Sequence, residues 1–555
     1  MTRSWLIFVS VATVLAAVLA GLRGLWSPDG VSIWIAGASL LIAAFTSGFV
    51  STHHFRGWRR KFWLRTDRYN QAVFLVLFVG CTFSFLFLFG ESAGVWGTAN
   101  PDNLGDMPFH LQLIESFARG AHFPPMDPTF AGEALHYPYA MDLWDALWVR
   151  LGIPVTSMLI VTGVIATLVT LIALWQAGDL VLVCAFFLSG GLVRGLDWQT
   201  GFGPSSPLVW KNLFLAVFLT QRGFLWAVPA GLYVIRKWNQ FLNEKDFQLQ
   251  TSFFWIWAVL PFFHLHTFVL LSFWMGLTIL FERRLPWKLI PASALALFFI
   301  LRSLTFQNVN SSLGWNWGWM FTGPQSVILN LGPWILVPIY VLIKWVREKN
   351  IKQIVISLTI TFFALNLKLS PWAWDQVKVL LWVYLLWTFW VIQEYNWKGR
   401  VAAIFSFFLF WSGALQWLSG WPSMTGRFEI QDATDRASVQ KLLMGLSPND
   451  VVAAEVDYRN PLLGSGQSLV LGYPAHAWSH GLAVDSRVAG LKQILAGAPG
   501  GEIFAKEVGV QWLVWKDDAS LQTSVPLEAW SKWGWTEQKK VGVWHLWKIV
   551  ESSVR

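Results

Sequence analysis

The stretch Gly97-Thr-Ala-Asn-Pro-Asp-Asn-Leu-Gly-Asp-Met-Pro-Phe-His110 opens the longest polar interruption in the first 420 residues of an apolar chain. The interruption continues to Trp148, and from Glu91 to Asp145 it carries eight carboxylates against one arginine, Arg119. Catalytic and binding side chains concentrate on loops that a rigid scaffold holds in place. We therefore expect this segment to be the active-site loop of a membrane enzyme.

The composition indicates that lipid is the solvent for most of the chain. Hydrophobic residues make up 55% of the 555 and charged residues 13%, whereas a soluble domain has about 25% charged residues. The mean hydropathy is +0.47. The net charge of +9 lies in short clusters between apolar segments, as it does in cytoplasmic loops, so we expect no nucleic-acid partner. Both cysteines, Cys81 and Cys184, lie in apolar segments, which excludes a disulfide framework and a cysteine metal site.

Apolar segments of about 17–25 residues can cross a bilayer as helices, and the sequence predicts about thirteen spans. The first is expected to be a retained span and not a cleaved signal peptide. The spans are placed at 4–23, 31–51, 71–90, 153–175, 179–196, 211–236, 251–264, 266–281, 288–304, 325–345, 351–368, 375–395 and 399–418.

The distribution of lysine and arginine predicts the orientation. With the N-terminus in the cytoplasm, the inner loops carry 19 of these residues and the outer loops about seven. The acidic loop and everything after residue 420 are then outside a bacterial inner or plasma membrane. This count requires the apolar run 251–281 to be two half-length helices broken near Pro261, because only a re-entrant pair keeps Arg283 and Arg284 inside.

The sequence predicts two domains: a multi-span domain at 1–419, whose outer loop is 91–152, and an extracytoplasmic α/β domain at 420–555. The second is large enough for a core of its own. Short alternating apolar runs predict strands, and amphipathic stretches between them predict helices. The strands are expected within 451–456, 468–472, 510–515 and 541–549, and the helices at 435–446 and 486–496.

Asp106 has two interpretations that the sequence leaves open. It can cap a helix at 107–119 that has Pro108 in its first turn and ends at Gly120. It can also act with His110, which lies four residues later on the same helical face, and with Asp102 upstream. Two carboxylates and an imidazole can bind a divalent cation or form a general base with an orienting partner. An apolar stripe of Phe109, Leu113 and Phe117 predicts that this helix lies along the membrane surface.

Three further segments carry candidate functional residues. The proline-rich and aromatic segment 122–139 is expected to be an ordered, extended cover whose rings suit the C–H faces of a sugar. The pair His476 and His480 is weak evidence for a metal, so we interpret its segment as a loop that packs on the membrane domain. His264 and His266, beside Pro261, are expected to be satisfied core histidines.

Arg222 falls near the middle of a predicted span, where an arginine must face a cavity or a partner. Its forked donors suit phosphate oxygens, and the alternative is a structural pair with a buried acid. Asp197 and Asp375 fall at the outer ends of spans, as do Lys211, Lys368 and Lys378. Carboxylates and cations are thus expected to gather on one side of the membrane.

These features resemble the C superfamily of glycosyltransferases, the multi-span enzymes that use polyprenyl-phosphate-linked sugars. The resemblance covers the whole chain as topology, while its motifs are short. It implies that Asp106 or Asp102 is the catalytic acidic residue of the first outer loop, that Asp197 or Asp375 is a second acidic site, and that Arg222, with Lys211 and Lys378, binds the donor phosphate. The chain has no adjacent acidic pair in the loop and lacks the Trp-Trp-Asp motif of oligosaccharyltransferases, which leaves the acceptor open.

The expected reaction is an inverting transfer of a sugar to an extracytoplasmic glycan, lipid or protein. A carboxylate deprotonates the acceptor hydroxyl, and the lipid phosphate leaves with help from Arg222 and from a divalent ion such as Mg²⁺ or Mn²⁺. That ion would be held by Asp102, Asp106 and His110. Two other functions stay open: a transporter or flippase of lipid-linked glycans, and a non-catalytic envelope assembly protein.

Overall fold

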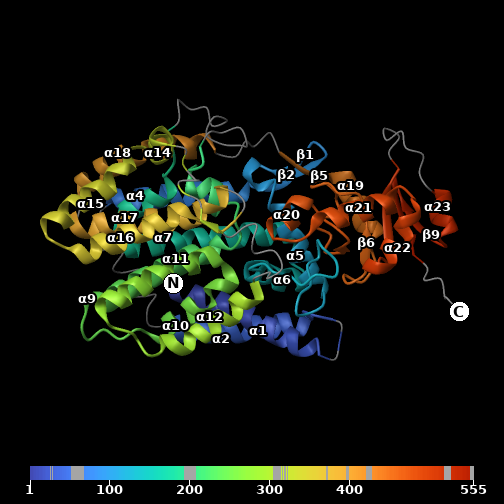
Figure 1. The fold of residues 1–555 in the computed structure, drawn as a ribbon, viewed down its shortest axis with the longest axis horizontal. Helices are drawn as coiled ribbons and strands as arrows, with labels where there is room; N and C mark the ends of the chain where they lie inside the picture. Colours follow the sequence, from blue (N-terminus) through green and yellow to red (C-terminus); the bar gives the residue numbers. More distant parts are fainter. Residues whose placement is uncertain are drawn as a thin grey trace.

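The computed structural model describes residues 1–25, 27, 29–51, 68–192, 208–303, 314–315, 317, 321, 323–370, 373–395, 399–420, 428–517 and 527–549. The protein is mostly helical, and its C-terminal region contains a sheet. In Figure 1 the helices occupy one end of an elongated molecule, the C-terminal region occupies the other, and α5 and α6 lie between them.

The helical region is a packed bundle in which most helices are apolar. Its long helices and their bounds are α1 (Thr2–Arg23), α2 (Ile33–Ser51), α4 (Arg68–Leu86), α7 (Val155–Phe187), α9 (Phe224–Asn243), α10 (Thr251–Phe263), α11 (Leu265–Glu282), α12 (Leu289–Ser303), α14 (Pro324–Leu331), α15 (Leu336–Arg347), α16 (Ile351–Asn366), α17 (Ala373–Tyr395) and α18 (Gly399–Ser419). Short helical turns also occur at η1 (Pro101–Asn103), η2 (Phe214–Phe218, a π-helix) and η3 (Gly332–Ile335).

Among the described residues, five helical segments are long and apolar enough to cross a membrane: Thr2–Arg23, Val155–Phe187, Leu265–Glu282, Pro324–Arg347 and Asp375–Tyr395. Six shorter apolar helices accompany them. These segments support a membrane protein. The number of thirteen spans and their direction stay predictions.

One predicted boundary between spans agrees with the structure, and one predicted span does not. α7 is two helices that meet at a kink with non-helical backbone at Gly178 and Asp179, in agreement with the boundary predicted between 153–175 and 179–196, although the second helix ends at Phe187. The span 211–236 is broken, because η2 ends at Phe218 and α9 begins only at Phe224. Gly223 in this break lies so close to the end of α10 that a Cβ would clash with the Phe263 carbonyl oxygen.

The predicted break near Pro261 is confirmed. α10 ends at Phe263 and α11 begins at Leu265, with His264 between them in extended backbone. The His264 ring accepts a hydrogen bond from the Thr267 backbone N–H at 3.2 Å and is buried, so this residue is the satisfied core histidine that the sequence predicts.

The acidic loop follows α4 in the chain and packs against the C-terminal region. A hairpin of β1 (Phe89–Ser92) and β2 (Val95–Thr98) is extended by β5 (Phe428–Asp432), which pairs antiparallel with β2. The loop then forms α5 (Met107–Arg119) and α6 (Ala140–Arg150). The predicted helix 107–119 is confirmed, and Gly120 ends it with a φ of +87°. Protein buries α5 on almost every side, so its apolar stripe packs against protein, and its orientation along the membrane surface stays a prediction.

The C-terminal region holds a five-stranded sheet in the order β7-β6-β8-β10-β9, in which β6 runs parallel to β7 and β8 while β10 pairs antiparallel with β8 and β9. The strands are β6 (Val451–Ala453), β7 (Ser468–Leu469), β8 (Trp512–Lys516), β9 (Thr536–Val541) and β10 (Trp544–Lys548). The helices are α19 (Ala433–Leu442), α20 (Pro474–Ser479), α21 (Val484–Leu495), α22 (Pro499–Val508) and α23 (Leu527–Lys532). The predicted α/β character is confirmed.

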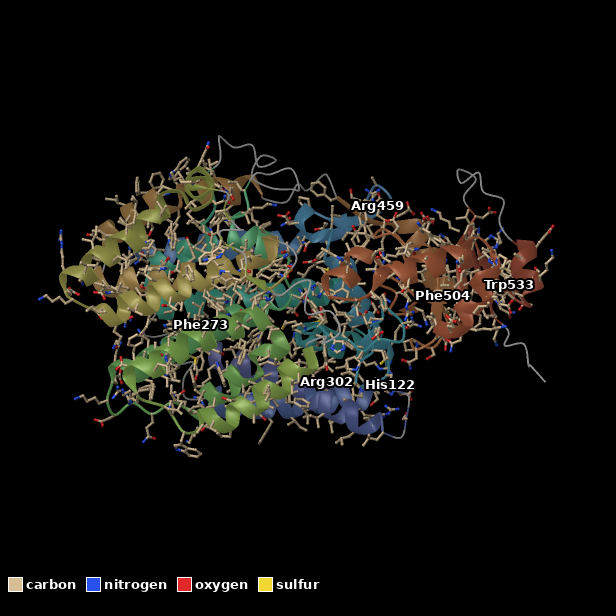
Figure 2. The ribbon with its side chains drawn as sticks, viewed as in Figure 1. His122, Phe273, Arg302, Arg459, Phe504 and Trp533 are labelled. Atoms are coloured by element: carbon tan, nitrogen blue, oxygen red, sulfur yellow. The ribbon has the colours of Figure 1, made fainter. Side chains whose placement is uncertain are left out.

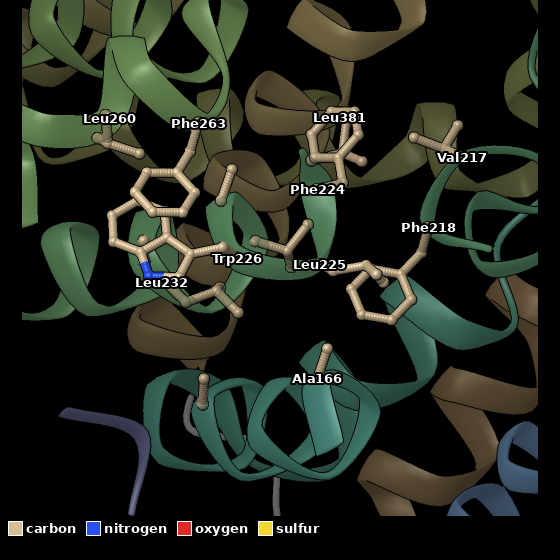
Figure 3. Packing of buried hydrophobic residues seen from close by; sticks show 14 of the residues in the cluster. Ala166, Val217, Phe218, Phe224, Leu225, Trp226, Leu232, Leu260, Phe263 and Leu381 are labelled. Atoms are coloured by element: carbon tan, nitrogen blue, oxygen red, sulfur yellow. The ribbon is translucent and has the colours of Figure 1, made fainter. Parts of the chain in front are cut away.

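Aromatic side chains fill the core of the helical region. Trp226 of α9 stacks on Phe263 at a centroid distance of 3.9 Å, and Figure 3 shows this pair among the surrounding apolar side chains. Phe273 stacks on Phe363 at 4.4 Å. Phe504 and Trp533 belong to a separate core in the C-terminal region, at the far end of the molecule in Figure 2.

Candidate active site

Asp106 stands immediately before α5, in the capping position, but its side chain makes no capping hydrogen bond within the described part of the chain. Its Oδ2 instead accepts a hydrogen bond from the Nε2 of Gln221, which lies in the break between η2 and α9. The side chain is partly exposed. The carboxylate is therefore directed toward the helical region and is available for chemistry.

His110 is turned to a different carboxylate. Its Nδ1 lies 3.0 Å from Oδ1 of Asp142 on α6, and the two side chains are 2% and 1% exposed. Across the described ranges, no group of three or more histidine, cysteine and acidic residues is placed to hold a metal ion. The predicted metal ligands Asp102, Asp106 and His110 therefore do not form such a site, because the histidine is held by α6.

Asp102 pairs with one of the predicted phosphate-binding lysines. Lys211 Nζ lies 3.1 Å from Asp102 Oδ1, and both side chains are largely buried. Burial raises the pKa of Asp102, the Lys211 ammonium opposes that shift, and the nearby Asp106 carboxylate adds to it. The two loop carboxylates are thus close enough to affect each other, and a lysine stands beside one of them.

Asp375 and Lys378 form a second acid–lysine pair at the start of α17. Lys378 Nζ lies 2.7 Å from Asp375 Oδ1, and the Ser370 hydroxyl donates to Asp375 Oδ2 at 2.5 Å. Burial raises the pKa of the Tyr137 hydroxyl well above its usual value, and the carboxylates of Asp106, Asp142 and Asp375 add to the shift. The Tyr137 hydroxyl is therefore within electrostatic range of the loop carboxylate Asp106 and of Asp375 on α17.

The C-terminal region contributes two histidines that the sequence did not predict to join Asp106. His476 Nε2 donates to the carbonyl oxygen of Gly105, the residue before Asp106. The Phe109 ring lies 5.0 Å from the His480 ring, and Tyr137 lies 5.1 Å from His480. Burial lowers the pKa of His476 and lowers that of His480 to about 3. Both imidazoles are therefore neutral at pH 7.

Arg222 pairs with Asp145 of α6, and the two side chains are 3% and 0% exposed. The Thr162 hydroxyl donates to the other carboxylate oxygen at 2.6 Å. Burial raises the pKa of Asp145 to about 6, although Arg222 opposes the shift. The structure thus places Arg222 as the partner of a buried acid, which was the alternative to a phosphate ligand.

The remaining predicted site residues lie apart from this cluster or outside the described residues. Asp197 belongs to residues 193–207, which the structure does not describe. Lys368 lies in the short strand β4 (Leu367–Lys368), paired with β3 (Gly314–Trp315). The segment 122–139 forms neither a helix nor a strand in the structure, and Tyr137 within it reaches the cluster.

Comparison with known proteins gives no relative from which a role can be transferred. No protein-family model matches this chain. No curated protein matches it either.

Proposed function

We propose that the protein is a membrane glycosyltransferase that moves a sugar from a polyprenyl-phosphate donor to an extracytoplasmic acceptor. The observation that carries the proposal is the Asp106 carboxylate, which stands at the junction of the acidic loop and the apolar helices and is hydrogen-bonded to Gln221. A donor with a lipid tail and a sugar headgroup requires such a junction, because the tail needs an apolar environment and the headgroup needs a polar one.

In the proposed reaction Asp106 takes the proton of the acceptor hydroxyl. The acceptor oxygen then attacks the anomeric carbon from the face opposite the leaving group, and the bond from that carbon to the phosphate oxygen breaks. The electron pair leaves with the lipid phosphate, and the configuration inverts. General-base catalysis of this kind contributes about 10²–10⁴-fold in rate.

Two lysines near the loop carboxylates are the proposed partners of the leaving phosphate. Lys211 and Lys378 each lie beside a carboxylate, at 3.1 and 2.7 Å, so the cations are held in place before a donor arrives. Preorganised positive charge stabilises a developing phosphate charge without further rearrangement. This assignment leaves out Arg222, because Arg222 and its partner Asp145 are 3% and 0% exposed, whereas Lys211 and Lys378 are 8% and 14% exposed.

The orientation proposed from the loop charges places this cluster outside the membrane. In Figure 1 the connections from α9 to α10 and from α15 to α16 lie at the end of the helical region away from the C-terminal region. Those connections carry the clustered lysines and arginines that the charge rule assigns to the cytoplasm. This arrangement supports a C-terminal region outside the membrane.

A transporter of lipid-linked glycans is the second candidate, because helices are interrupted at His264 and between η2 and α9. Broken helices at membrane depth build the substrate sites of many transporters. A transporter moves its substrate intact, whereas a transferase separates the sugar from the lipid. The two proposals therefore differ in whether the bond between the sugar and the lipid phosphate breaks, which can be measured.

The test uses purified protein in detergent with a panel of radiolabelled polyprenyl-phosphate sugars. Detergent removes the two sides of the membrane, so transport gives no signal. We expect the label to leave the lipid, by transfer or by hydrolysis of the donor, and Asp106→Asn to slow that loss. Label that stays on the lipid with every donor would contradict the proposal.

A further inference from the structure

The segment Tyr473–Gly481 of the C-terminal region reaches across to the start of α5. It contains α20, which Figure 1 places beside α5. Its His476 donates from Nε2 to the Gly105 carbonyl oxygen, which is 371 residues away in sequence. A carbonyl oxygen can only accept, so the proton of this neutral imidazole is on Nε2.

We propose that His476 is a positioning residue that sets the orientation of Asp106 through the Gly105 carbonyl. The inference rests on the proposed function, in which Asp106 is the general base. It assigns to the C-terminal region a part in catalysis that is separate from stability.

The geometry of the peptide bond gives the reason. The Gly105 carbonyl and the Asp106 N–H belong to one planar group. A hydrogen bond that fixes the carbonyl direction fixes this plane, and the Asp106 Cα and side chain follow from it. Gly105 is exposed, and a Cβ added to it would meet no heavy atom within 4 Å. Side-chain packing around Gly105 therefore contributes little to fixing the plane.

The side chain of Asp106 needs such an external restraint. Its carboxylate is directed to Gln221 and not to the N–H groups of α5. The direction of the side chain thus depends on the backbone at 105–106 and on one amide donor. Misplacement of a reacting group by about 1 Å can cost on the order of 10²-fold in rate.

Burial and two neighbouring aromatic rings hold the His476 ring in place. It is 9% exposed, with the Tyr473 ring at 5.1 Å and the Phe109 ring at 5.6 Å. Its Nδ1 is buried and has no hydrogen-bond partner in the part of the chain that the structure describes. The bond to Gly105 is therefore the polar contact that anchors this imidazole.

The test compares His476→Gln, His476→Phe and the matched control His545→Phe in the full-length protein. A glutamine Nε2 can replace the donating nitrogen, whereas phenylalanine keeps the ring and loses the donor. His545 is in the same region, on β10, and pairs with Glu537 at 2.7 Å. Transfer kinetics are measured with a polyprenyl-phosphate sugar, and hydrogen exchange is measured over residues 100–112.

We expect His476→Phe to lower kcat by about 10–10²-fold with KM within about 3-fold of wild type, and to raise exchange over 100–112. His476→Gln should restore most of kcat, and His545→Phe should change neither measurement. Equal loss of kcat in His476→Phe and His476→Gln, or no loss in His476→Phe, would overturn the inference.

The exchange measurement separates this inference from the proposed function. If wild type transfers no sugar, the proposed function fails, and exchange over 100–112 still reports the bond. Unchanged exchange in His476→Phe would then overturn the inference about His476, whatever the outcome for the proposed function.

Discussion

Asp106 occupies the position of a helix cap, but its side chain accepts its hydrogen bond from a buried residue elsewhere in the chain. A capping aspartate accepts from the first N–H groups of its helix, whereas Asp106 accepts from Gln221, which lies 115 residues away in sequence. Asp432 provides the contrast within the same chain, since its side chain caps α19 by accepting from the Asp435 N–H at 2.8 Å.

The first prediction separates these two roles by side-chain length. Serine caps a helix about as well as asparagine, but it is too short to reach Gln221 from position 106. We expect Asp106→Ser to be less stable than Asp106→Asn by about 1 kcal/mol, because the buried Gln221 amide loses its partner. At Asp432 the same two substitutions should be equal. Thermal unfolding in detergent measures both pairs, and equal stability of the two variants at position 106 would restore the capping interpretation.

The second prediction concerns the buried pair of Arg222 and Asp145. Arg222→Ala leaves an unpaired acid that is 0% exposed, which costs about 3–5 kcal/mol. The double substitution Arg222→Met with Asp145→Leu removes both charges and should recover most of that stability. Chemical denaturation of the purified variants provides the measurement. If Arg222→Ala loses donor binding and keeps its stability, Arg222 is a phosphate ligand after all.

Sequence spacing predicted the local geometry of the candidate residues better than it predicted their partners. Asp106 and His110 do share the start of one helix, as their i, i+4 spacing indicates. The partner of His110 is Asp142, 32 residues on, and the contact of His476 with Gly105 spans 371 residues. Periodicity carries local geometry alone, and contacts at such separation depend on tertiary packing.

Among the helices and strands, α5 is one contact of the acidic loop with the C-terminal region, in addition to the pairing of β2 with β5. Gln112, at 0% exposure, accepts from the Gly464 N–H at 2.8 Å and from the Gly466 N–H at 3.1 Å. Its amide also donates to the carbonyl oxygen of Gln467. One buried side chain thus satisfies three backbone groups of the turn before β7.

The third prediction follows from that contact. Gln112→Met keeps the length of the side chain and leaves two glycine N–H groups without their acceptor, at a cost of about 2–4 kcal/mol. Gln538→Met is the matched control, because Gln538 is exposed on β9 and bonds only Thr536 among the described residues. Unfolding midpoints compare the two variants. Equal midpoints would mean that α5 and the turn dock through their apolar contacts alone.

The sequence predicted the elements whose signals are local. Pro108 and Gly120 marked both ends of α5, and the alternating apolar runs marked β6, β7, β8 and β10. β9 was missed because its residues, Thr-Glu-Gln-Lys-Lys-Val, are polar and largely exposed at the edge of the sheet. The break between η2 and α9 falls on the polar residues Thr220-Gln-Arg-Gly223, which were included in one span, and the close approach of Gly223 to Phe263 is a tertiary contact.

In the whole molecule, the proposed function requires the cluster to face outward from the membrane. The fourth prediction tests this with single cysteines at exposed positions: Met126 at 44%, Met444 at 73%, and the exposed Asp246 between α9 and α10. The native Cys81 and Cys184 are buried, which keeps the background low. An impermeant thiol reagent should label Met126→Cys and Met444→Cys in intact cells, and Asp246→Cys only after permeabilisation. Labelling of Asp246→Cys in intact cells would invert the orientation.

The most direct test of the central claim is a single-turnover measurement with a radiolabelled polyprenyl-phosphate sugar in proteoliposomes, with wild type and Asp106→Asn side by side. Asparagine keeps an acceptor for Gln221 and cannot take a proton. We predict that wild type releases the label from the lipid, and that Asp106→Asn binds the donor equally well and releases the label on the order of 10²-fold more slowly. Equal rates in the two proteins, or label that remains on the lipid in both, would contradict a glycosyltransferase with Asp106 as its base.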